Sequence, residues 1–152
     1  MVLSEGESAP EVSARNQDGE AVSIDGTEPA VLYFYPRDDT PGCSLEARQF
    51  QAELETFAEA GVTVYGVSTD GVDSHADFAS SEDLEFDLLA DPDSALVEAF
   101  DVETRSGAAA RTTFVLDDGR VWRAYENVSP DGHARSVLED LLDAGLVELP
   151  DL

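Results

Sequence analysis

The residue best suited to covalent chemistry is Cys43, the only cysteine among the 152 residues of the chain. It follows a turn-rich segment, RDDTPG, and starts a pattern of apolar residues at the spacing of one helix face. The members of this stripe are Cys43, Ala47, Phe50, Leu54 and Phe57. The charged residues expected off the stripe are Glu46, Arg48, Glu53, Glu55 and Glu59. The pattern predicts a helix with Cys43 in its first turn, on the side that faces the protein.

A cysteine in the first turn of a helix is well placed to ionise. The N–H groups of that turn have no partners within the helix, and the helix dipole is positive there. Such cysteines can have pKa values of roughly 3.5 to 7.5 instead of about 8.5. The N–H groups of Gly42, Cys43 and Ser44 are candidates to bind a polarised oxygen, and the Thr40 hydroxyl is within reach if the loop turns back. A small buried hydrophobe is the alternative role for a lone cysteine, and spacing alone leaves the two open.

One cysteine permits no internal disulfide and no CxxC pair, so any redox cycle must use a second thiol from elsewhere. The two histidines, His75 and His133, lie far apart in the sequence and form no metal-ligand spacing. We therefore expect no metal and no other cofactor. Both histidines are expected on helix surfaces, near the N-termini of their helices.

The charge of the chain is extreme, with 34 acidic residues against 8 basic ones and a formal net charge of -26. All eight basic residues are arginines. Such a surface excludes nucleic acid and anionic membranes as partners. Mutual repulsion strains the compact state in dilute buffer and is screened by salt, so the composition resembles that of proteins from salt-loving organisms. An ordinary acidic protein is the alternative, and the absence of lysine favours salt adaptation.

The start of the chain has neither the basic nor the apolar region of a signal peptide. No apolar run reaches the length of a membrane-spanning helix. A cytoplasmic location is expected.

Strand and helix patterns alternate along the middle of the chain. A hairpin is predicted over residues 10–25 and two more strands around Asp118-Gly119. Buried strands are predicted over residues 31–36 and 62–68, and a short strand over residues 86–91. Helices are predicted to begin at Ser74, which resembles a capping box with Asp77, at Pro92 and at Pro130. The last helix has an apolar face made of Val137, Leu138, Leu141 and Leu142. This order predicts an α/β fold in which helices flank a mixed sheet, as one domain over residues 1–152.

The string P-x-x-x-T-x-x-C, from Pro36 to Cys43, resembles the active-site signature of the peroxiredoxins. FYPRDDTPGCSLEA is similar to the PrxQ, or bacterioferritin comigratory protein, branch. Further segments resemble that branch in the same order: APEVSARNQDGEAVSI, VYGVSTDGVDSHADFA, LLADPDSALVEAFDV and RTTFVLDDGRV. The resemblance covers most of the chain and implies a thioredoxin-like fold with an N-terminal β-hairpin and a peroxide-reducing cysteine.

The resemblance assigns roles to individual residues. Cys43 matches the peroxidatic cysteine, and Thr40 the hydroxyl that bonds both thiolate and peroxide. Pro36 matches the proline that shields the pocket from water. Arg111 matches the arginine that reaches the site from a neighbouring strand, and Glu46 resembles a supporting carboxylate. The expected peroxide-binding residues are Thr40, Gly42, Cys43 and Arg111.

The implied reaction converts the Cys43 thiolate to a sulfenic acid and releases water or an alcohol. Many members of the branch carry a resolving cysteine five residues later, where this chain has Arg48. An external thiol, either small or on a thioredoxin-like protein, is therefore expected to reduce the sulfenic acid. The expected assembly is a monomer or a weak homodimer. The alternatives are a peroxide-sensing redox switch and a non-catalytic thioredoxin-like binding module.

Overall fold

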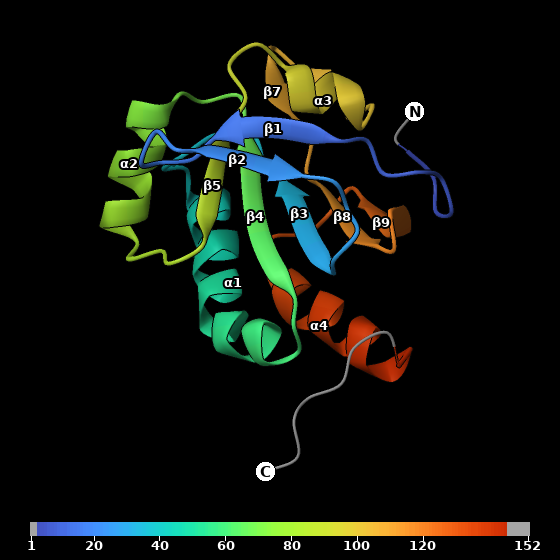
Figure 1. Ribbon diagram of the computed structural model, residues 1–152. Coiled ribbons are helices and arrows are strands. Elements are labelled where there is room, and N and C mark those ends of the chain that lie inside the picture. Colours follow the sequence, from blue (N-terminus) through green and yellow to red (C-terminus); the bar gives the residue numbers. More distant parts are fainter. Residues whose placement is uncertain (1–2, 146–152) are drawn as a thin grey trace.

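In the computed structural model, which describes residues 3–145, seven strands form one mixed sheet in the order β2-β1-β5-β4-β3-β8-β9 (Figure 1). These strands are β1 (Val12–Arg15), β2 (Ala21–Ile24), β3 (Ala30–Phe34), β4 (Thr63–Ser68), β5 (Asp87–Ala90), β8 (Thr112–Asp117) and β9 (Arg120–Glu126). The helices are α1 (Pro41–Glu59), α2 (Val72–Ser81), α3 (Ala95–Ala99) and α4 (His133–Asp143). The predicted mixed α/β, thioredoxin-like architecture with an N-terminal hairpin is confirmed.

Strand β3 lies inside the sheet, between β4 and β8, and is buried along its whole length. It pairs in parallel with β4 and antiparallel with β8, in a register that places Phe34 opposite Thr112. Alternating side chains of a strand point to opposite faces, so both faces of β3 need an apolar cover. This burial on both faces explains why the strand has a continuous apolar run instead of alternating apolar and polar residues.

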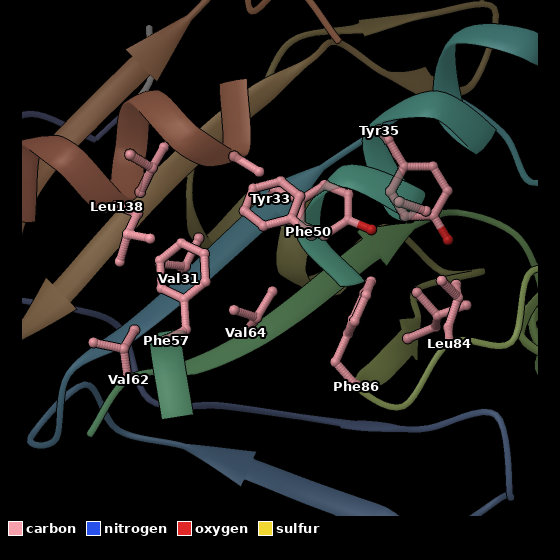
Figure 2. Close-up of a cluster of buried hydrophobic side chains, with 14 of the residues drawn as sticks. Val31, Tyr33, Tyr35, Phe50, Phe57, Val62, Val64, Leu84, Phe86 and Leu138 are labelled. Atoms are coloured by element: carbon pink, nitrogen blue, oxygen red, sulfur yellow. The ribbon is translucent and has the colours of Figure 1, made fainter. Parts of the chain in front are cut away.

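Helices α1, α2 and α4 supply the apolar side chains that cover one face of the sheet, and Figure 2 shows part of that cluster. Tyr33 stacks on Phe50 of α1 with ring centroids 4.3 Å apart, and Phe57 and Leu138 pack nearby. A second cluster covers the opposite face and includes Leu32, Phe34 and residues of α3. The apolar stripe predicted for α1 is confirmed, since its members pack into the first cluster.

Three predicted helix starts are wrong. α2 begins at Val72 after Gly71, and Ser74 lies inside the helix with its hydroxyl bonded to Asp38 instead of capping. α3 begins after Ser94 and α4 after Gly132, both of which have left-handed backbone angles, so neither Pro92 nor Pro130 opens a helix. At α3 the first-turn N–H groups of Leu96 and Val97 donate to the Asp91 carboxylate, which replaces the predicted proline start.

A short hairpin, β6 (Thr104–Arg105) and β7 (Ala108–Ala109), was not predicted. It turns at Ser106 and Gly107, which both have positive φ angles. The Ser-Gly dipeptide is the signal in the sequence that marks this turn. Within residues 3–145, none of the helices combines the length and apolarity needed to cross a membrane.

Candidate active site

The start of α1 places Cys43 at the carboxyl end of β3. Thr40 is the N-cap residue, Pro41 occupies the first helical turn, and Cys43 follows with 1% of its surface exposed. The Ser44 N–H donates to the Thr40 carbonyl at 2.8 Å, so one of the three N–H groups predicted to be free is already bonded. The N–H groups of Gly42 and Cys43 have no acceptor among the residues that the structure describes.

Arg111 joins Cys43 to Glu46. Its Nη2 donates to the Cys43 Sγ at 3.3 Å, and its Nη1 donates to the Glu46 Oε1 at 2.9 Å. Arg111 immediately precedes β8, and the pairing of β8 with β3 carries it to the start of α1. The structure thus brings together the cysteine, the arginine and the carboxylate that were predicted from the sequence.

Glu46 is buried, with 1% exposure, and the prediction that it lies off the buried stripe is wrong. It lies one helical turn after Cys43, and residues three apart on a helix share a face. Burial raises the pKa of Glu46 to about 7, although the Arg111 guanidinium acts in the opposite direction. Its Oε2 atom has no hydrogen-bond partner among the described residues. This carboxyl group therefore ionises less readily than a solvent-exposed glutamate does.

Gly42 makes room for the guanidinium. A Cβ atom at this position would lie 2.7 Å from the Arg111 Nη2 and 3.6 Å from the Pro130 Cγ. The absence of a side chain lets Arg111 approach the first turn of α1 and reach the sulfur.

Thr40 and Pro36 lie in the loop between β3 and α1. The Thr40 hydroxyl donates to the Arg37 carbonyl at 3.2 Å, and in this structure it is not bonded to the Cys43 sulfur. Asp39 between them has a left-handed backbone with φ of 58°, which is uncommon for a residue other than glycine. The loop thus holds Thr40 next to the nucleophile, with its hydroxyl turned to the main chain.

A pocket of about 410 Å³ lies beside the guanidinium. Its lining residues are Pro36, Arg105, Ala108, Ala109, Ala110, Arg111, Asn127 and Val128. Most of this wall is apolar, and the unpredicted β6–β7 hairpin forms part of it. A larger hollow of about 720 Å³ lies near α2 and the β1–β2 turn, and none of the predicted site residues lines it.

The prediction that both histidines lie on helix surfaces is wrong. His133 is 8% exposed, and its Nε2 atom lies 2.8 Å from the Thr113 Oγ1. Burial lowers the pKa of His133 to about 4, so this ring is neutral near pH 7. His75 is fully buried and contacts the Asp38 carboxylate, in the same loop as Thr40. No cluster of three potential metal ligands occurs within the described part of the chain.

The profile of the AhpC/TSA family matches residues 6–124. The chain belongs to the AhpC/TSA family. Peroxiredoxin Bcp of Bacillus subtilis is 35% identical, over 94% of this chain and 98% of that protein. Peroxiredoxin Bcp of Xanthomonas campestris is 41% identical, over 73% of this chain and 74% of that protein. The chain is therefore a peroxiredoxin of the Bcp/PrxQ group, which comprises thiol-dependent peroxidases.

Solved structures agree with this assignment. Peroxidoxin BcpB from Mycobacterium tuberculosis superposes with a TM-score of 0.85 at 32% identity, over 91% of this chain and 96% of that one. A cysteine-to-serine mutant of PrxQ from Xylella fastidiosa gives a TM-score of 0.85 at 31% identity, over 95% of this chain and 96% of that one. This peroxiredoxin acts on a peroxide and requires a thiol reductant.

Proposed function

We propose that this peroxiredoxin is a one-cysteine enzyme in which Cys43 reduces the peroxide and an external thiol completes each cycle. The observation that carries the proposal is the 3.3 Å contact between the Arg111 Nη2 and the sulfur of the only cysteine. A guanidinium remains charged at all physiological pH values, so it stabilises negative charge on the sulfur. The positive end of the α1 dipole adds to this stabilisation.

The reaction begins when the Cys43 thiolate attacks one oxygen of the peroxide. The S–O bond forms as the O–O bond breaks, the sulfur is oxidised to a sulfenic acid, and the leaving oxygen departs as water or an alcohol after taking a proton. Arg111 and the free N–H groups of Gly42 and Cys43 stabilise the charge that develops on the leaving oxygen. When a peroxide binds, the Thr40 hydroxyl donates its hydrogen bond to the peroxide instead of to the Arg37 carbonyl. Pro36, which lines the pocket, limits the access of water.

The second half of the cycle uses two thiols from outside the chain. The first attacks the sulfenic sulfur, releases water and forms a mixed disulfide; the second breaks that disulfide and regenerates the Cys43 thiolate. Arg48 stands where many relatives carry a resolving cysteine, and it bonds to Glu82 at 3.4 Å. The reductant is therefore a small thiol or a thioredoxin-like protein. Without an internal partner, the sulfenic acid is open to further oxidation.

The first test is hydrogen peroxide consumption by the reduced protein in molar salt, with dithiothreitol as reductant and Cys43→Ser as the control. Many turnovers that vanish in Cys43→Ser are expected. Consumption of a single equivalent despite excess reductant would support a peroxide-sensing switch instead. No consumption would leave only a thioredoxin-like binding module.

The apolar pocket beside Arg111 supports activity on organic hydroperoxides as well as hydrogen peroxide. The bacterioferritin comigratory protein of Xanthomonas campestris, whose solved structure is similar to this one, is described as having alkyl peroxide reduction activity. The kcat/KM values for cumene hydroperoxide and hydrogen peroxide test this range: we expect the two values to lie within about tenfold of each other.

The charge of -26 and the absence of lysine support salt adaptation. We propose that residues 1–152 act in the cytoplasm as one domain, as a monomer or weak homodimer, without nucleic acid or membrane partners. The melting temperature should rise markedly from dilute buffer to molar salt because salt screens the like charges. A melting temperature independent of salt would refute the salt adaptation.

A further inference from the structure

Asp38 lies at the centre of a buried network next to the catalytic loop. Its side chain is 3% exposed, and its Oδ1 atom accepts a hydrogen bond from the Tyr35 hydroxyl at 2.6 Å. Its Oδ2 atom accepts from the Ser74 hydroxyl at 2.7 Å and contacts the His75 Nδ1 at 2.7 Å. Three polar groups therefore surround one carboxylate that has almost no contact with water.

The hydrogen-bond partners of His75 constrain where its protons lie. The Nε2 atom lies 3.0 Å from the Leu89 carbonyl oxygen, which can only accept, so Nε2 carries a proton. The Nδ1 atom faces the Asp38 oxygen, which also accepts from Ser74. Asp38 accepts from two hydroxyl groups, as an ionised carboxylate does, and such a carboxylate accepts from a protonated Nδ1 as well. The hydrogen-bond pattern therefore fits a His75 imidazolium paired with an Asp38 carboxylate.

The main chain of Asp38 is held as firmly as its side chain. Its N–H group donates to the Asp70 Oδ2 at 2.8 Å, and the Ser68 hydroxyl donates to that same oxygen at 2.7 Å. Ser68 is the last residue of β4. The carboxylate that contacts His75 is thus Asp38 from the β3–α1 loop, and Asp70, from the segment after β4, holds the Asp38 N–H group. The Tyr35 ring also lies next to the His75 ring, with centroids 6.3 Å apart.

We propose that the buried Asp38–His75 pair positions the loop of Pro36 and Thr40 against Cys43, which makes His75 a positioning residue for peroxide reduction. Asp38 lies between Pro36 and Thr40, so fixing its side chain and its N–H group leaves this loop little freedom. Both ring nitrogens of His75 are taken up by Asp38 and Leu89, and His75 does not line the pocket beside Arg111. The inference rests on the proposed function, because it concerns the rate at which Cys43 reacts with a peroxide.

The kinetic test compares two reactions of reduced Cys43 in folded variants. Asp38→Asn and His75→Gln each remove one charge of the pair, and His133→Gln is the matched control because it removes the other buried histidine, which bonds to β8 and not to the loop. We expect the rate constant with hydrogen peroxide to fall by about 10²-fold in the first two variants, since a displacement of about 1 Å has that effect. Alkylation by iodoacetamide needs no peroxide-binding loop, so its rate should stay within about threefold of the unmodified value.

A milder variant covers the case in which the charge variants fail to fold. Ser74→Ala removes one hydrogen bond from the Asp38 carboxylate and leaves both charges in place. It should lower the peroxide rate in the same direction but less, with alkylation unchanged.

The protonation of His75 is testable in the unmodified, reduced chain. Long-range ¹H–¹⁵N correlation spectra at pH 7 should show two protonated ring nitrogens for one histidine and a single protonated nitrogen for the other. His133→Gln assigns the two signals. A spectrum in which both rings are neutral would overturn the charged pair.

The positioning role fails if folded His75→Gln reduces peroxide at the unmodified rate, or if peroxide reaction and alkylation fall together. Both outcomes differ from a failure of the proposed function, in which the unmodified protein itself shows no Cys43-dependent turnover.

Discussion

On the face of the sheet covered by α1, α2 and α4, the protein buries Cys43, Glu46 and both histidines among its apolar side chains. On the opposite face, Phe34, Phe100 and Phe114 pack together with ring centroids 4.9 to 5.8 Å apart. Buried ionisable groups oppose folding unless they are paired, whereas close-packed aromatic rings favour it. Both faces pack aromatic rings, including Tyr33 on Phe50, but the face bearing the site must also accommodate these buried ionisable groups.

The largest effect is expected from the cluster of Phe34, Phe100 and Phe114. Phe114 is completely buried, so Phe114→Ala should lower the free energy of unfolding by about 3–5 kcal/mol. Urea denaturation at a fixed molar salt concentration measures this loss. The peroxide rate constant of the protein that remains folded should be unchanged. A proportional loss of that rate constant would show that the two faces are not separable.

On the face bearing the site, Arg111→Gln should lower the rate constant for peroxide reduction. Loss of a charged donor from such a site lowers the rate by about 10²–10³-fold, or about 2.7–4 kcal/mol. The second-order rate constant with hydrogen peroxide, measured by stopped flow, checks this. Arg111→Lys keeps the charge but loses the fork that reaches both the sulfur and Glu46, so it should restore only part of the rate. Full activity in Arg111→Gln would contradict the proposed role.

Glu46→Gln tests the cost of burying a carboxyl group. Glu46 has a pKa of about 7 in the folded protein against an ordinary value of 4.5. Its proton is therefore retained longer by the folded state than by the unfolded state. The resulting stabilisation is complete below pH 4.5 and is lost as the pH rises through 7. As the pH rises from 4.5 to above 7, the free energy of unfolding of Glu46→Gln should increase by up to about 3 kcal/mol relative to that of the unmodified protein.

Urea denaturation of the two proteins at several pH values measures this difference. Parallel stability curves between these pH values would mean that the Arg111 guanidinium keeps Glu46 ionised throughout.

The smallest expected effect is that of Gly42→Ala, which should lower the peroxide rate constant without lowering the stability of the fold. In Gly42→Ala the new Cβ lies 2.7 Å from the Arg111 Nη2, so the guanidinium must move. Alanine favours helix, so the free energy of unfolding should not fall. The peroxide rate constant should fall by about tenfold, which corresponds to about 1.4 kcal/mol. Gly71→Ala is the matched control, because Gly71 also lies at a helix start and a Cβ added there would meet nothing within 4 Å. Equal rates in the two variants would show that Gly42 has no special role.

Local patterns in the sequence determined much of this protein. The alternation of apolar runs and helical stripes predicted the mixed sheet, its β1–β2 and β8–β9 hairpins and the position of Cys43 in the first turn of α1. These predictions succeeded because strand and helix periodicity depend on neighbouring residues. The helix starts at Pro92 and Pro130 failed because carboxylate capping and left-handed residues, which depend on the surrounding fold, set the observed boundaries.

Only the tertiary structure decided how the site is assembled. Arg111 reaches Cys43 across 68 residues because β8 pairs with β3, and no local pattern encodes that contact. The same assembly buries Glu46 and His75, two polar side chains that a helical pattern alone places in solvent. Their burial is possible because their charged partners, Arg111 and Asp38, come from other segments of the chain. The sequence by itself therefore determined the nucleophile and its helix, and folding determined the electrostatic environment in which it reacts.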